Sequence, residues 1–195
     1  MSQSCLECFQ NSGKSGSELQ IAVDESFPGF ACECERCSPY SPGPVANDED
    51  LAFILVEPVH YDPVTETISP DAFQELTRRD LSLIRLNIAT QSDFDKTVET
   101  LVQGRVANQP KRAVQKVCLA DAASIRDVNI DGIRIFAVYD TALEHSNAHA
   151  SIFTTKAAIQ GDKVTRKRVR QACHSALSRR VMPANEVRAN LRTAI

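Results

Sequence analysis

The spacing of apolar positions along the chain predicts several strands. Residues 51–61, LAFILVEPVHY, form an aliphatic run with the length of a buried strand. In LSLIRLNIA, Leu81 and Leu83 alternate with Ser82 and Ile84, which predicts a second strand. Three more strands are expected at residues 112–120, 132–140 and 149–155.

Helices are predicted between these strands from capping residues and from the helical period. Ser69 is a good N-cap, and Pro70 follows it at the first helical position of residues 69–76. Residues 92–104 repeat this arrangement and end at Gly104. A short helical turn at 121–128 and a long helix at 162–181, ended by Pro183, complete the pattern.

The mixture of helices and strands indicates an α+β (mixed α/β) fold with two unequal parts. Residues 51–195 are expected to form a mixed-sheet domain with a long C-terminal helix. Residues 1–40 are expected to form a small zinc-ribbon-like lobe, with a strand at 18–24. The proline-rich residues 41–50 are interpreted as a linker.

The composition is that of a soluble globular protein. Of the 195 residues, 43% are hydrophobic and 24% are charged. No segment approaches the roughly 18 apolar residues that a membrane span requires. Residues 1–16 lack the basic and apolar regions of a secretory signal, so we expect a cytoplasmic protein without a membrane partner.

Five of the seven cysteines lie in the first 37 residues and predict a Zn²⁺ site. Cys5 and Cys8 form one Cys-x-x-Cys turn, and Cys34 and Cys37 form a second. Two such turns supply the four thiolates of a closed structural zinc site. Cys32 is the surplus thiol, or else it replaces Cys34 as a ligand.

Other interpretations of these cysteines are weaker. Glu7, Glu33, Glu35 and Arg36 make the segments too polar for an ordinary core. A redox Cys-x-x-Cys normally opens a helix beside a βαβ unit, and none is predicted here. Zinc would therefore fold the small lobe and perform no chemistry. The two remaining cysteines, Cys118 and Cys173, are expected in the core.

The polar residues His60, Arg85 and His149 form a candidate catalytic set at predicted strand ends. Arg85 would bind an anionic group, and one histidine would move a proton. The alternative is that both histidines are hydrogen-bonded to backbone and that Arg85 extends its charge from a sheet edge. The i, i+4 pair His145 and His149 also allows a second metal, although the zincin glutamate is absent.

The same residues carry a resemblance to a known group of proteins. His60, Ser69, Phe73, the LSLIR segment with Ser82 and Arg85, and NAHA with His149 are the residues concerned. This pattern resembles a family of uncharacterised bacterial proteins with the order His, Ser, Phe, Leu-Ser-x-x-Arg and Asn-Pro-Ala-His-Ala. The resemblance spans about residues 57–153 and departs at Asn147-Ala148, where proline is expected. It implies no activity.

Charge is distributed unevenly along the chain. Residues 1–62 hold eleven Asp and Glu, whereas the chain from Lys163 onward holds nine Lys and Arg and a single acid, Glu186. Such a basic helix could bind nucleic acid through phosphates, without stacking aromatics, or it could pack against the acidic lobe. The candidate contact residues are Lys163, Arg166, Lys167 and Arg170.

Two functions follow from these patterns. The first is a zinc-binding accessory protein that acts with a protein partner or with nucleic acid. The second is a small enzyme, a transferase or hydrolase, acting on a phosphate-bearing substrate through His60, Arg85 and His149. The chain has no P-loop, no Gly-x-Gly-x-x-Gly motif and no Gly-x-Ser-x-Gly elbow, so no nucleotide cofactor is indicated.

Overall fold

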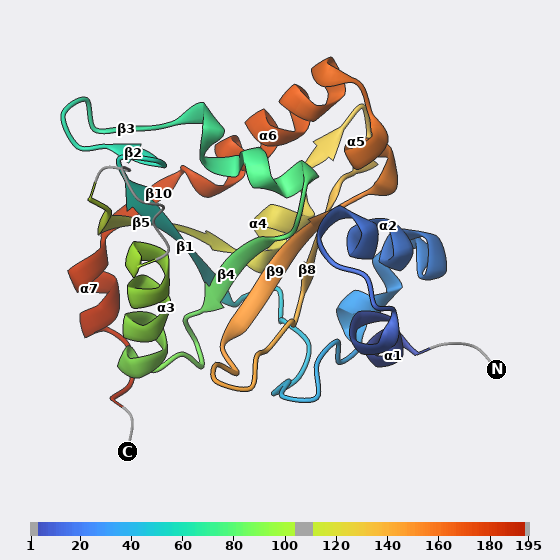
Figure 1. Cartoon of the computed structure of the whole chain (residues 1–195), viewed down its shortest axis with the longest axis horizontal. Coiled ribbons are helices and arrows are strands. Elements are labelled where there is room, and N and C mark those ends of the chain that lie inside the picture. The colour runs from blue at the N-terminus through green and yellow to red at the C-terminus, as the bar shows by residue number, and fades with distance from the viewer. Residues whose placement is uncertain (1–3, 104–110, 194–195) are drawn as a thin grey trace.

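A six-stranded antiparallel sheet organises the computed structural model, which describes residues 4–103 and 111–193 (Figure 1). The strand order is β10-β5-β1-β4-β9-β8. The strands of this sheet are β1 (Asp50–Glu57), β4 (Leu81–Arg85), β5 (Ala113–Asp121), β8 (Phe136–Tyr139), β9 (His149–Thr154) and β10 (Arg180–Pro183). Two small hairpins pair β2 (Tyr61–Asp62) with β3 (Thr67–Ile68), and β6 (Asn129–Ile130) with β7 (Ile133–Arg134).

The expected α+β class is confirmed, but the expectation of a mixed sheet is wrong. Every strand pair described in the large sheet is antiparallel. Pairing direction depends on contacts between distant segments, such as β1 with β4, and the local pattern of apolar residues does not contain it.

One face of the sheet carries the largest apolar core. Phe73 and Leu76 from η2, Ile125 from α4 and Leu177 from α6 pack there on Leu51 and other strand residues. Cys118 and Cys173 belong to this core, as expected. The covering elements are η2 (Pro70–Thr77), α4 (Ala122–Arg126), α5 (Lys156–Gln160) and α6 (Lys163–Leu177).

The opposite face is covered in two separate places. Helices α3 (Gln91–Gln103) and α7 (Ala184–Ala189) pack on β1 and β5 at one end. The N-terminal elements α1 (Cys5–Asn11), α2 (Gly16–Ser26) and η1 (Pro28–Cys34) pack on β8 and β9 at the other. Figure 1 shows the two groups at opposite ends of the molecule. The surface of β4 and β9 that lies between them is the part of this face left for a site.

The strand expected at residues 18–24 is wrong, because this segment belongs to α2. Leu19, Ile21 and Val23 alternate, which is the strand period, but Leu19, Ala22 and Val23 also fit one helix face. The structure uses the second pattern and places Val23 in a cluster with Cys5 and Cys8.

The residues interpreted as a linker are closely packed. Val45 lies in the main core, and the backbone carbonyls of Gly43 and Pro44 accept hydrogen bonds from Arg85. Arg126 donates to the carbonyl of Val45. Residues 41–50 therefore lie against the sheet domain and are held there by buried side chains.

The long predicted C-terminal helix ends earlier than expected. Helix α6 stops at Leu177, and β10 follows, with Val181 opposite Cys118 on β5.

Of the helices in residues 4–103 and 111–193, none combines the length and the apolar character needed to cross a membrane.

Candidate functional site

A cavity lies where the sheet opens between β1 and β4. The two strands pair only at Leu51 with Arg85 and at Ala52 with Ile84, and beyond these pairs they diverge (Figure 1). The cavity measures about 360 Å³ and has apolar walls from both strands. Helix α3 and η2 complete it, and His60, Asp80, Ser82, His145 and His149 are among its polar lining residues.

A chain of hydrogen bonds orients His149 at this cavity. The Ser151 hydroxyl donates to Asp80 Oδ2 at 2.6 Å, so Ser151 Oγ accepts from the Thr141 hydroxyl at 2.8 Å. Thr141 Oγ1 and the Thr141 carbonyl are then both acceptors for His149 Nδ1, each at 3.0 Å. The proton of neutral His149 therefore resides on Nδ1, and Nε2 keeps its lone pair.

The surroundings of His149 favour the neutral ring. Burial lowers the pKa of His149, although the hydrogen bond to the Thr141 backbone and the charge of Asp80 act in the opposite direction. The charge of His145 lowers this pKa further. A neutral ring with a free Nε2 lone pair is the form that accepts a proton, so His149 is suited to act as a general base.

His60 lines the same cavity but is bound to its own turn. Its Nδ1 accepts from the Val56 backbone N–H at 3.3 Å, and its ring stacks on Phe53 with centroids 5.6 Å apart. Burial lowers the pKa of His60, and a backbone hydrogen bond to Ile54 opposes this. His60 thus matches the alternative of a half-buried histidine held by backbone.

Arg85 is not brought together with the two histidines. His149 lies opposite Ile84 in the β4–β9 pair, so the next residue, Arg85, faces the other side of the sheet. There Arg85 forms two hydrogen bonds with Glu49, at 2.8 and 2.6 Å, and its Nη1 lies 3.3 Å from Asp140 Oδ1. Its guanidinium holds residues 43–49 against the sheet and has no access to the cavity.

Asp140 beside Arg85 is the most strongly perturbed carboxyl in this buried group. Its side chain is fully buried, and burial raises the pKa of Asp140 to about 6. The positive charge of Arg85 lowers this pKa and limits the rise. Arg85 is therefore the guanidinium that contacts both carboxylates, and the more distant charge of Arg126 also lowers the pKa of Glu49.

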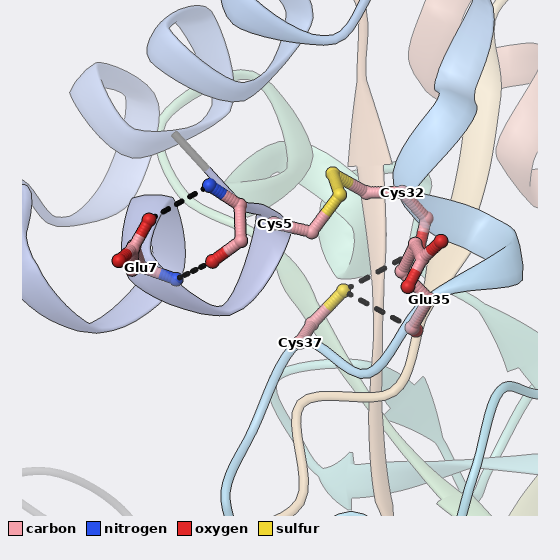
Figure 2. The surroundings of a disulfide bond; sticks show 6 residues. Cys5, Glu7, Cys32, Glu35 and Cys37 are labelled. Carbon is pink, nitrogen blue, oxygen red and sulfur yellow. Dashed lines mark hydrogen bonds between the residues drawn. A yellow bond between two sulfur atoms is a disulfide. The ribbon is translucent and has the colours of Figure 1, made fainter. Parts of the chain in front are cut away.

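The cysteine segments meet at the N-terminal end of the sheet. Cys5 and Cys32 form a disulfide, next to which Figure 2 shows Cys37. Cys8 and Cys37 are buried free thiols of the same cluster. Cys34 is exposed. Burial, together with the nearby charge of Asp140, raises the pKa of Cys37 to about 12. In the described ranges 4–103 and 111–193, no group of three or more His, Cys, Asp or Glu side chains is arranged to hold a metal ion.

The predicted nucleic-acid contacts lie on α6. Lys163, Arg166 and Lys167 are exposed and Arg170 is half-buried. Within the described part of the chain none of the four forms an ion pair, whereas Arg168 binds Asp131 through two hydrogen bonds. The N-terminal acids Glu33 and Asp50 pair instead with Arg126 and Arg180. The acidic lobe therefore does not neutralise these four cations.

Sequence reasoning missed Asp80, Thr141 and Ser151, which orient His149. A signal for Ser151 was its position in the alternating strand HASIFT, on the same face as His149. Asp80 and Thr141 carried no comparable signal, since they flank strands and meet Ser151 only through the pairing of β4, β8 and β9.

No family model, no curated protein and no solved structure matches this chain. The resemblance carried by His60, Ser82, Arg85 and His149 stays a prediction.

Proposed function

We propose that the cavity between β1 and β4 is the active site of a small enzyme, a hydrolase or transferase, in which His149 transfers a proton. The observation that carries this proposal is the Asp80–Ser151–Thr141 chain, which commits Nδ1 of the cavity-lining His149 and leaves its Nε2 unprotonated. A base needs a fixed tautomer and a nearby space for its substrate, and this arrangement supplies both.

The lining of the cavity limits the class of substrate. Its volume of about 360 Å³ is near the lower end of the usual range for ligand pockets, about 300–1,000 Å³. The charged residues on the wall are Glu75, Asp80 and Asp93 against Arg79 and Lys96, and Arg79 is already paired with Glu75. Because the wall carries more acids than cations and Arg85 lies on the other face of the sheet, the charge of the cavity does not favour binding of a phosphate group. We therefore propose a small substrate with an apolar body and an uncharged polar group.

Blocking the cavity is the direct test of this proposal. Ser82 is exposed and lines the cavity from β4, so Ser82→Phe places a large ring in the substrate space. Small uncharged fragments are screened against the wild-type protein by thermal shift. A fragment at about 100 times its Kd should stabilise the fold by about 2.7 kcal/mol, and Ser82→Phe should abolish that shift.

The matched control is Ser175→Phe, which adds the same ring at an exposed position on α6, away from the cavity. This variant should bind the fragments as the wild type does. If Ser82→Phe keeps the shifts, the fragments bind elsewhere and the proposed cavity is not the binding site.

Four cations of α6 that form no ion pair with the residues in 4–103 and 111–193 support a second candidate function, nucleic-acid binding. Lys163, Arg166, Lys167 and Arg170 lie within eight residues of one helix, and Val169, Cys173 and Leu177 attach that helix to the core. Cations that neutralise phosphates give binding that weakens steeply with salt. The helix would act on backbone phosphates, because no aromatic side chain lies among these residues.

Charge reversal tests this second candidate. In a gel-shift titration with duplex DNA or RNA, the double variant Arg166→Glu/Arg170→Glu should bind at least about tenfold more weakly and show a shallower salt dependence. Arg36→Glu is the control, since Arg36 is exposed but lies outside α6. Equal binding by the wild type and the double variant would exclude α6 as the contact surface.

A further inference from the structure

Four of the five N-terminal cysteines converge in one buried cluster. Their exposed fractions are 7% for Cys5, 1% for Cys8, 0% for Cys32 and 2% for Cys37. Phe9, Tyr139 and Phe153 surround them with aromatic rings. Cys34 is the exception, because its side chain is exposed. The cluster therefore holds the number of thiols that a closed zinc site requires.

The backbone brings these four thiols together from three directions. Cys5 and Cys8 are three residues apart on α1 and so share one face of this helix. Ser4 and Glu7 fix the start of α1 through a reciprocal capping box. Cys32 comes from η1, and Cys37 follows with its Sγ 3.5 Å from the Cys32 carbonyl oxygen (Figure 2).

We propose that Cys5, Cys8, Cys32 and Cys37 bind one Zn²⁺ ion when the Cys5–Cys32 bond is reduced, and that Cys34 is the surplus thiol. A dithiol reductant transfers two electrons and two protons to the Cys5–Cys32 disulfide and becomes a disulfide itself. Zn²⁺ then displaces the four thiol protons and bonds to four thiolates.

The disulfide alone does not account for this cluster. It uses two of the four buried sulfurs and leaves Cys8 and Cys37 as free thiols next to it. A zinc ion uses all four, and it links α1 to both ends of the segment 32–37. It would thereby close the N-terminal elements on β8 and β9 in place of the disulfide.

The position of Cys34 follows from the same geometry. Cys32 has no exposed surface and is bonded to Cys5, whereas Cys34, two residues later, is exposed. A ligand at residue 34 would require this side chain to turn inward and Cys32 to leave the cluster. The geometry points to Cys32 as the ligand.

Metal analysis of the full-length chain tests this proposal. The protein is reduced anaerobically with a phosphine, incubated with Zn²⁺ and freed of loose metal by gel filtration. About one zinc per chain is expected in the wild type and in Cys34→Ser, whereas Cys8→Ser and Cys37→Ser should retain little. Circular dichroism of each variant shows whether it is folded.

A cobalt measurement keeps the test independent of the variants. Reduced wild-type protein with Co²⁺ should show the thiolate charge-transfer band and the visible bands of a tetrahedral site. Less than about half an equivalent of bound zinc in the reduced wild type would overturn the proposal, because a closed thiolate site binds tightly. Loss of zinc in Cys34→Ser, with retention in Cys32→Ser, would overturn the ligand assignment.

Discussion

The variant Arg85→Met is expected to lose about 3–5 kcal/mol of unfolding free energy at pH 7, the typical cost of breaking a buried ion pair. Arg85 is 4% exposed and compensates two carboxylates, Glu49 and Asp140, in the same buried site. Methionine has a similar length but supplies neither charge nor hydrogen bonds. Urea denaturation of the purified protein measures the loss.

The loss of unfolding free energy in Arg85→Met, relative to the wild type, should become smaller as the pH falls. Burial already raises the pKa of Asp140 to about 6 in the presence of Arg85. A carboxyl whose folded pKa is raised destabilises the fold while it is charged, above that pKa, and the penalty disappears as it binds a proton. Without Arg85 this pKa rises further, so the variant should recover part of its stability between about pH 7 and pH 5.

Two further variants make this result specific to the ion cluster. Arg79→Met removes a solvent-accessible ion pair with Glu75, and the loss of unfolding free energy should stay below about 1 kcal/mol. The triple variant Arg85→Met/Glu49→Gln/Asp140→Asn removes all three charges of this cluster, so part of the lost stability should return. An Arg85→Met protein as stable as the wild type at pH 7 would show that the guanidinium does not hold this site together.

The variant His149→Gln is expected to lower kcat/KM about 10²–10⁴-fold for a substrate found through the fragment screen, the range typical of a lost general base. Glutamine preserves the approximate size of the side chain but does not titrate. The limb of the pH–rate profile that belongs to the base should disappear as well. Steady-state kinetics from pH 5 to pH 9 provide both quantities.

His60 is the rival base in the same cavity, and His60→Gln distinguishes the two. Because Nδ1 of His60 accepts from the Val56 N–H and its ring stacks on Phe53, this change should reduce stability by about 1–2 kcal/mol. The pH–rate profile should keep its shape. The reverse outcome, in which His60→Gln loses the low-pH limb of the profile and His149→Gln keeps it, would assign the base to His60.

Much of the secondary structure could be predicted from local patterns. The strands predicted in LSLIRLNIA and at 149–155 are present as β4 and β9, and Ser69 caps η2 as the pattern predicted. Errors arose where one pattern fits two structures, as in residues 18–24, or where a short edge strand follows a helix, as in β10. In both cases contacts with distant residues decide between conformations of similar local preference.

The candidate site divides in the same way between sequence and tertiary structure. The sequence alone determined that His60 and His149 are polar residues beside strands, that Cys118 and Cys173 are apolar core thiols, and that α6 is basic. Only the tertiary structure decided which of these residues meet. The register of β4 with β9 puts Ile84 opposite His149, and strand alternation then sends Arg85 to the other face. Local periodicity specifies which residues share a face of one element, whereas the pairing of strands far apart in the chain specifies which faces form a site.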